Sequence, residues 1–439
     1  MNCMKKTILA SLIALSASGA FVSNRAIAGV PPVEHQVSIS NDASEFFTVE
    51  VSGTSYERGY KHGRELRKVI RHAVNRFKYD MVSNLLSSLG TDLKYADFHN
   101  HIFNNTGLLA TAKKEVPDLV EEMQGIADGS GLSFEEIFAW NATSYDAMFW
   151  VIEDMTGIDP MLAMEKAQHG SAIPGHCSHA SVWGDNKASV GYTLDWIRAM
   201  EGSQSLIKHV NDDGSVILMT AFAGMVGGHG IYAKEGAAHT FSPHSKFQLE
   251  HNMNGLAQIF VYRKLLEAGS VDNGIEFLNN IKPAEGLTYT LTDYTGTRAF
   301  EVSANKVVEF KMDGNQMVSA NVARVNNDLS VSYKADLHLT DTKIDMTNLP
   351  TTYWEYNKDS VNRFKLLSSS IKGKTPADMN PEKWTEIFSQ KPVNKPVDEK
   401  LETSNFWHVV EIDQEYINYH VAPSNPGNIK LESYRIKYN

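Results

Sequence analysis

Apolar residues recur at helical spacing through much of the first third of the chain. From Tyr56 the larger apolar side chains are mostly three or four residues apart, which predicts an amphipathic helix. Gly59 and Gly63 lie four apart on one face of it, and because glycine weakens a helix interior, they predict a close backbone contact. A second helix is predicted from Pro117 to Gly129, and a third after the capping box that begins at Ser133.

After residue 176 the apolar pattern changes to the alternation typical of strands. Two hairpins are predicted, Cys177–Val182 with Val190–Trp196 and Trp407–Ile412 with Ile417–Val421. Further strands are predicted at Phe46–Val51, Val216–Thr220, Thr288–Thr292, Ala299–Val302, Val307–Phe310 and Val318–Ala320, and helices at Ala257–Ala268, Asp272–Asn280 and Tyr356–Ser369. The stretch Gly157–Gly175 is expected to be an exposed connector. Strands flanked by helix pairs predict a layered α+β body.

The first 28 residues have the pattern of a secretion signal. Lys5 and Lys6 precede an apolar stretch, and Ala26-Ile27-Ala28 is the small-x-small sequence that signal peptidase cleaves. We therefore expect a signal peptide over 1–28 and a periplasmic or secreted protein. No later segment is apolar over a length that would span a membrane, so no stable membrane span is expected.

Charge and cysteine count narrow the function. The full chain has a formal net charge of −11, and loss of the basic leader makes it more acidic, which argues against binding to a nucleic-acid backbone. Of two cysteines, Cys3 leaves with the leader and Cys177 alone stays, so no internal disulfide is expected. A lone thiol is at risk in an oxidising compartment, which favours a chemical role; the alternative is a small buried hydrophobic residue.

The run Gly175-His176-Cys177-Ser178-His179-Ala180-Ser181-Val182-Trp183-Gly184, closing at Gly191-Tyr192-Thr193-Leu194-Asp195-Trp196, resembles the isopenicillin-N acyltransferase family of self-cleaving hydrolases and acyltransferases. Weaker matches are Tyr56–Gly63, Tyr289–Glu301, Val318–Asn321 and Ser360–Arg363. The resemblance implies the four-layer αββα sandwich of N-terminal-nucleophile hydrolases. It also implies self-cleavage at His176-Cys177 into a helical piece, 29–176, and a catalytic piece, 177–439. The two pieces are expected to stay associated, in a protomer that could form a homo-oligomer.

The resemblance assigns a role to several side chains. Cleavage before Cys177 frees an α-amine whose pKa of about 8 is close to that of a thiol, about 8.5, so one residue can serve as nucleophile and base. Asp195 would orient this amine, or else bond local backbone groups. Asn321 would donate to the oxyanion, or else be a turn residue. Arg363 would pair with a carboxylate at the site, or else be solvated on its helix.

Two positions depart from the family pattern. His176 stands where the family usually has glycine, and a bulky residue there is expected to slow self-cleavage, although its imidazole could assist as an acid or base. Tyr192 stands where an arginine that shapes the substrate site is common, and Thr193 replaces asparagine. The acyl or amine preference is therefore expected to differ from that of typical members.

Two other groups of residues could suggest a metal site or a phosphate-binding loop, but their patterns do not match either. Four histidines between residues 229 and 251 have spacings that match no compact zinc site, and no metal or other cofactor is expected. Gly224–Gly230 lacks the Lys and Ser/Thr of a phosphate loop and is expected to form a turn or line the substrate site.

These observations predict an exported, self-cleaving cysteine amidohydrolase or acyltransferase. It would act on the amide or thioester of a small N-acyl substrate through an acyl-Cys177 intermediate. Two alternatives stay open: a phospholipase B-like or bile-salt/penicillin-V-type acylase of the same superfamily, and a secreted binding protein in which Cys177 is structural.

Overall fold

The computed structural model of the 439-residue chain describes residues 33–37, 45–159, 177–339, 344–395, 402–427 and 431–439. The expected signal peptide, His176 and nearly all of the expected connector lie outside these ranges. Among the described residues, no helix combines the length and the apolar character that crossing a membrane requires.

Two large β-sheets form the centre of the molecule. The first has the strand order β1-β15-β14-β13-β4-β3-β12 and is antiparallel throughout. Its strands are β1 (Val33–Val37), β3 (Ser178–Gly184), β4 (Lys187–Ile197), β12 (Gln316–Ser319), β13 (Glu402–Ile412), β14 (Tyr416–Ala422) and β15 (Glu432–Lys437). Both predicted hairpins are therefore confirmed, as β3–β4 and β13–β14.

The second sheet has the order β11-β10-β9-β8-β7-β6-β5-β2. Its strands are β2 (Phe47–Val51), β5 (Gln204–Val210), β6 (Val216–Phe222), β7 (His229–Lys234), β8 (Ala237–Ser245), β9 (Leu287–Asp293), β10 (Gly296–Val302) and β11 (Val307–Phe310). β2 runs parallel to β5, and the other neighbours are antiparallel.

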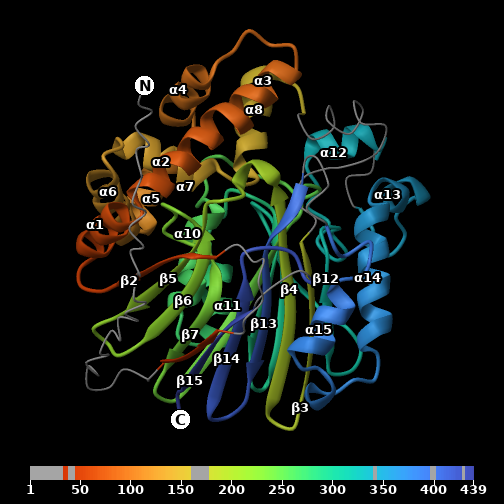
Figure 1. Ribbon diagram of the computed structural model, residues 1–439. Coiled ribbons are helices and arrows are strands. Elements are labelled where there is room, and N and C mark those ends of the chain that lie inside the picture. Colours follow the sequence, from red (N-terminus) through yellow and green to blue (C-terminus); the bar gives the residue numbers. More distant parts are fainter. Residues whose placement is uncertain (1–32, 38–44, 160–176, 340–343, 396–401, 428–430) are drawn as a thin grey trace, which may run out of the picture.

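The two sheets face each other and helices cover their outer faces (Figure 1). α14 (Lys358–Ile371) and α15 (Pro381–Phe388) pack on the first sheet, and α10 (Gln258–Glu267) and α11 (Val271–Asn280) pack on the second. The short helices α12 (Val331–Asp336) and α13 (Thr351–Tyr356) and the 3₁₀ turns Arg198–Met200 and Pro376–Asp378 connect these elements. This arrangement confirms the α+β class and the four-layer αββα sandwich.

The N-terminal helices gather at one end of the sheets (Figure 1). They are α1 (Ser55–Glu65), α2 (Arg67–Arg76), a π-helical segment (Phe77–Ser83), α3 (Asn84–Ser88), α4 (Tyr95–Asn105), α5 (Leu108–Glu115), α6 (Pro117–Ser130), α7 (Phe134–Thr143) and α8 (Ala147–Thr156). The long helix predicted from Tyr56 is interrupted at Leu66, where the backbone has φ −100° and ψ 18°. The Ser133–Glu136 capping box is present.

The glycines of α1 and α6 let the two helices touch through their backbones. A Cβ on Gly59 would lie 1.9 Å from the carbonyl oxygen of Glu122, and one on Gly63 would lie 2.4 Å from that of Ile126. The facing glycines of α6 are Gly125 and Gly129. The close contact predicted for α1 is confirmed. The predicted end of this helix at Gly129 is wrong, because Gly129 lies within α6 and makes this contact. The helix ends at Gly131, which has the left-handed φ of +70°.

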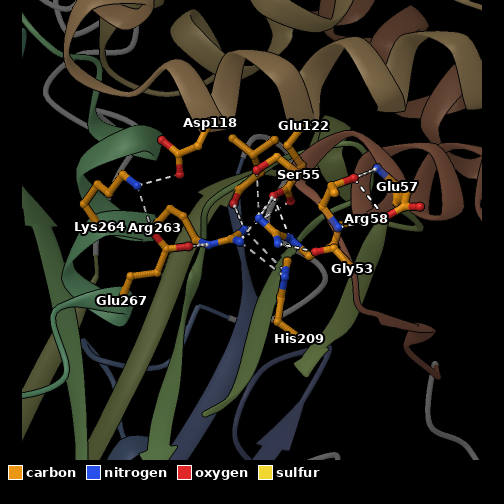
Figure 2. Close-up of polar contacts among 12 residues, drawn as sticks. Gly53, Ser55, Glu57, Arg58, Asp118, Glu122, His209, Arg263, Lys264 and Glu267 are labelled. Atoms are coloured by element: carbon orange, nitrogen blue, oxygen red, sulfur yellow. Dashed lines mark hydrogen bonds and ion pairs between the residues drawn. The ribbon is translucent and has the colours of Figure 1, made fainter. Parts of the chain in front are cut away.

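A buried ion-pair network joins this helical region to the second sheet (Figure 2). Arg263 of α10 is fully buried and pairs with Glu122 of α6 through two bonds, Nη1–Oε1 at 3.1 Å and Nη2–Oε2 at 3.2 Å. Arg58 of α1 also reaches Glu122, and His209 of β5 lies 3.4 Å from Arg263 Nη1. This buried network thus connects helices that precede residue 177 with a helix and a strand that follow it.

Candidate active site

The end of β3 places Cys177 between the sheets. Cys177 directly precedes β3 and is 6 % exposed. β3 pairs with β4 so that Ser178 lies opposite Thr193, and the Cys177 thiol is 3.8 Å from the carbonyl oxygen of Asp195. The hydroxyl of Tyr192 donates to the carbonyl of Pro243 at 3.0 Å and lies near the same thiol, whose pKa it acts to lower. The hairpin therefore brings three of the predicted site residues together, Cys177, Tyr192 and Asp195.

Arg363 of α14 is the centre of a second group of contacts. It is fully buried, and its Nη1 donates to the carbonyl oxygen of Cys177 at 2.7 Å and to Ser178 Oγ at 3.0 Å. Its Nη2 donates to Asn321 Oδ1 at 3.1 Å, and its Nε donates to Asp359 Oδ2 at 2.7 Å. Arg363 is thus not solvated on its helix. Its carboxylate partner is on its own helix, while its contacts at Cys177 are a carbonyl and a hydroxyl.

Asn321 follows β12 and is fixed from both sides of its amide. Its Oδ1 accepts from Arg363, and its Nδ2 donates to the carbonyl of Ser245 at 3.1 Å. Lys246 supports the same segment, since its Nζ donates to the carbonyls of the two residues that flank Asn321, namely Ala320 and Val322. Burial lowers the pKa of Lys246 to about 7. The Asn321 side chain is therefore held in place by direct hydrogen bonds with Arg363 and Ser245.

Asp195 lies on β4 with no solvent exposure. Its Oδ2 accepts from Thr193 Oγ1 at 3.4 Å, and its backbone lies opposite Ser404 of β13, next to a bulge between Ser404 and Phe406. Thr193, which departs from the family pattern, thus contacts the carboxylate that the resemblance assigns to the site.

The electrostatics around Cys177 keep its thiol protonated in the uncut chain. Burial, reinforced by the charge of Asp195, raises the thiol pKa to about 12. The hydrogen bonds with the Asp195 backbone and the Tyr192 hydroxyl, and the charge of Arg363, act in the opposite direction but do not overcome burial. Since the thiolate is the nucleophile, the thiol of the continuous chain is a weak one.

Aromatic rings and histidines surround Tyr192 between the sheets. Its ring centroid is 5.3 Å from that of His229, 5.5 Å from that of His244 and 5.5 Å from that of His408. Burial lowers the pKa of His229 to about 3 and also depresses those of the other two, so these rings are neutral. The inner faces of the sheets here carry uncharged polar rings instead of aliphatic side chains.

The four histidines between residues 229 and 251 do not share one site. His229 and His244 lie at Tyr192, His239 contacts the carbonyl of Leu265 at 2.9 Å, and His251 stacks on Trp150 at 4.0 Å between centroids. In the part of the chain that the structure describes, no group of three or more His, Cys, Asp or Glu residues is arranged to hold a metal ion.

The Gly224–Gly230 segment forms a buried turn after β6 and continues into the first two residues of β7; a turn is one of the two expectations for it. Its backbone meets the N-terminal helices. Gly224 N–H donates to His62 Nε2 at 3.2 Å, and Asn141 bonds both the carbonyl of Gly224 and the N–H of Val226.

Two polar residues near this site, Asp146 and Lys246, were not identified as candidates from the sequence. Asp146 directly precedes α8 and is 1 % exposed, and Ser245 Oγ donates to its Oδ1 at 2.8 Å. Lys246 supports Asn321 through the carbonyls of the two residues that flank it. An acid before the apolar run of α8 was the one visible hint for Asp146, since a carboxyl beside buried residues needs a partner.

Comparison with known proteins supports the family expectation. The family model described as acyl-coenzyme A:6-aminopenicillanic acid acyl-transferase matches residues 223–403, which confirms the resemblance seen in the sequence. The matched range contains Asn321 and Arg363, while Cys177 and Asp195 lie before it. At the level of the family, the match indicates acyltransferase or hydrolase activity on acyl substrates. A comparison with curated proteins finds no match.

Proposed function

We propose, from the match to the acyl-coenzyme A:6-aminopenicillanic acid acyl-transferase family model, that the protein is a self-activating cysteine amidohydrolase or acyltransferase. Its substrate would be a small N-acyl compound, and its intermediate an acyl group on Cys177. One observation carries the proposal: Arg363 links the Cys177 carbonyl to Asn321, while the Cys177 thiol lies beside Asp195. Arg363 thus joins the residue that carries the nucleophile to the amide donor, and the backbone carbonyl of Asp195 lies at the thiol.

The first step of the proposal is the cut before Cys177. The thiol attacks the carbonyl carbon of residue 176, the peptide nitrogen of Cys177 leaves as an amine, and the N-terminal piece becomes a thioester on sulfur. Water then hydrolyses this thioester to a carboxylate and the free thiol. Because burial raises the thiol pKa to about 12, this step needs local proton transfer and is expected to be slow.

The cut supplies the base for turnover. The new α-amine of Cys177, with an intrinsic pKa of about 8, can take the thiol proton directly or through water. The thiolate attacks the substrate carbonyl, and the amine returns the proton to the leaving nitrogen. Water, or an acceptor amine or thiol, then releases the acyl group. Asp195 is proposed to orient the α-amine, and the Arg363 bond to the Cys177 carbonyl to fix the residue that carries it.

Asn321 and Tyr192 are proposed to act on the substrate oxygen and on the thiol. One Nδ2 hydrogen of Asn321 bonds the carbonyl of Ser245, and the other is suited to donate to the oxyanion. A donor of this kind contributes roughly 3 kcal/mol to transition-state stabilisation. Tyr192, in place of an arginine, presents a neutral hydroxyl, which favours an uncharged substrate group near the thiol.

The proposed pieces are interleaved, so we expect them to remain associated after the cut. Before residue 177, β1 adds to the first sheet and β2 to the second. Glu122 and Arg263 form a buried ion pair across the same boundary, and Trp140 Nε1 donates to the carbonyl of Ala223 at 3.1 Å. Export through the signal peptide at 1–28 stays part of the proposal.

The test is intact mass and N-terminal sequencing of purified wild type and Cys177→Ala. We expect two pieces from the wild type, one of them beginning at Cys177, and one uncut chain from the variant. Ser181→Ala on the same strand is the control, because Ser181 bonds His179 and Thr297 but makes no contact with the thiol. It should be cut like the wild type. A wild type that stays intact would remove the free-amine base and with it the proposal.

A further inference from the structure

Two buried carboxyl groups lie next to the proposed site, and among the described residues neither forms an ion pair. Asp146 and Glu285 are each 1 % exposed. Each anchors one oxygen: Asp146 Oδ1 accepts from Ser245 Oγ at 2.8 Å, and Glu285 Oε2 accepts from the backbone N–H of Gln258 at 3.0 Å. Their other oxygens, Asp146 Oδ2 and Glu285 Oε1, have no hydrogen-bond partner among the described residues.

The surrounding side chains add further acceptors. Gln258 uses its Nε2 to bond the Tyr262 hydroxyl at 3.2 Å, and its Oε1 has no partner within the described ranges. The buried hydroxyls of Ser144 and Tyr289 are also without one there. Buried polar atoms are nearly always hydrogen-bonded, and a buried carboxylate needs a positive partner. Three acceptor oxygens from three side chains therefore fit a group that donates several N–H bonds.

These residues are adjacent to Cys177 through short connections. Ser245 bonds Asp146 with its hydroxyl and Asn321 with its carbonyl. Ser245 is opposite Leu287 in the β8–β9 ladder, and the next backbone bond joins Lys246 N–H to the carbonyl of Gly286, the residue after Glu285. Ser245 thus bridges Asp146 and Asn321. Glu285 lies at the same end of the β8–β9 ladder, because the residue after it bonds the residue after Ser245.

We infer that Asp146 and Glu285, with Gln258, bind an aliphatic ammonium group of the substrate. This rests on the proposed function and specifies its substrate class as N-acyl compounds that carry a primary amine. An ammonium group has three N–H donors for Asp146 Oδ2, Glu285 Oε1 and Gln258 Oε1. It also supplies the positive charge that two buried carboxylates lack.

The charge state of the acids agrees with a site completed by a cation. Burial raises the pKa of Asp146 to about 7, and burial together with the charge of Asp146 raises that of Glu285 well above its usual range. Burial raises the pKa of Tyr289, and the charges of Glu285 and Asp146 add to this effect. A bound ammonium would favour their ionised forms. The competing explanation is a purely structural pair of protonated acids that stabilises the fold and contacts no substrate.

The first experiment measures binding and needs no turnover. Titration calorimetry of the wild type compares n-pentylamine with 1-pentanol, which share chain length and differ in the ammonium group. We expect the amine to bind at least tenfold more tightly, and Asp146→Asn or Glu285→Gln to reduce that preference to below threefold. Glu309→Gln, which alters a carboxylate paired with Arg298 at the sheet edge, is the control and should keep the preference.

The second experiment measures hydrolysis with matched amides. N-acetyl-diaminoalkanes of two to six carbons are compared with N-alkylacetamides of the same lengths. At the best length, kcat/KM is expected to favour the ammonium member by at least tenfold in the wild type and by less than threefold in Asp146→Asn. Melting temperatures of the variants show whether they are folded.

The outcomes separate this inference from the proposed function. Equal binding of amine and alcohol by the wild type, or an unchanged preference in both folded variants, would overturn the ammonium site and leave the hydrolase untouched. Amine-selective binding that the variants lose, in a protein that never cleaves at Cys177, would support the site and reject the proposed mechanism.

Discussion

The guanidinium of Arg363 donates to the carbonyl oxygen of Cys177 at 2.7 Å, although 186 positions separate the two residues in sequence. The same guanidinium holds Ser178 and Asn321. A planar cation with five N–H donors is suited to fixing several groups at once. The position of the nucleophile and that of the proposed oxyanion donor therefore depend on one side chain.

Arg363→Lys is expected to lower kcat by at least about 100-fold, because an ammonium cannot reproduce the planar geometry that reaches both Cys177 and Asn321. Mass spectrometry should also show slower self-cleavage. The control is Arg298→Lys, whose guanidinium is 44 % exposed and pairs at the sheet edge. A folded Arg363→Lys protein with wild-type kcat and cleavage would contradict this prediction.

Asn321→Ala is expected to lower kcat by about 10²–10³-fold with little change in KM, because the oxyanion develops only in the transition state. Steady-state kinetics on any cleaved substrate separates the two constants. The matched control is Asn141→Ala, since Asn141 is also a buried amide, and its bonds are to Ile137, Gly224 and Val226, away from the thiol. An increase in KM alone would indicate that Asn321 binds substrate instead.

Glu122→Gln is expected to destabilise the protein by about 3 kcal/mol, because Arg263 loses its bidentate partner and keeps only Glu267 of its own helix, while Arg58 loses its ion pair as well. Urea unfolding measures the loss. Asp118→Asn removes a neighbouring pair with Lys264 in which the carboxylate is 40 % exposed, and it should cost less than about 1 kcal/mol. Figure 2 shows the two pairs side by side. Equal losses of unfolding free energy in both variants would contradict the prediction that the buried Glu122 pair contributes more than the exposed Asp118 pair.

Gly59→Ala is expected to cost about 2–3 kcal/mol, because the added methyl would lie 1.9 Å from a carbonyl oxygen of α6 and the two helices would have to separate. Alanine is otherwise the better helix former, so propensity predicts the opposite sign. Glu65→Ala, an exposed change on the same helix, is the control. Thermal unfolding of the wild type, Gly59→Ala and Glu65→Ala tests this prediction. A stabilised Gly59→Ala would show that α1 and α6 are not in contact.

Acid is expected to destabilise the fold through its buried histidines. In the folded protein the pKa of His229 is about 3, whereas in the unfolded chain it is about 6.5. Between these values the unfolded chain binds the additional proton, so stability falls as pH decreases below about 6.5, by about 1.4 kcal/mol per pH unit for each such histidine. Urea unfolding at pH 7, 6 and 5 gives the free energy of unfolding at each pH. This free energy should decrease less steeply with falling pH in His229→Phe than in the wild type. Parallel slopes would mean that His229 is not buried as a neutral ring.

Local patterns predicted ten of the fifteen strands that the structure describes and missed β1, β5, β15, β7 and β8; the last two show why. Both faces of these strands are buried, and they contain His229, His239 and His244, so no alternation of apolar and polar residues marks them. The hairpin β3–β4 was predictable because a turn at Gly184–Lys187 separates two strand-like runs.

The site could be predicted only in part, for a related reason. Cys177 and Asp195 are neighbours through one hairpin, so sequence spacing brings them together. Arg363 and Asn321 were indicated by family resemblance, because their contact depends on how α14 packs against β3 and β12. Asp146 and Lys246 had no such marker, since their partners are single atoms of distant residues.

The pairing of β1 with β15 brings the beginning and the end of the described chain together, with Val33 opposite Ile436. A short linker could therefore join the two termini without disturbing either sheet. A circular permutant built on that linker and opened before Cys177 would start with the nucleophile's α-amine already free. Such a rearranged chain would need no activation step, and its activity would separate the chemistry of maturation from the chemistry of turnover.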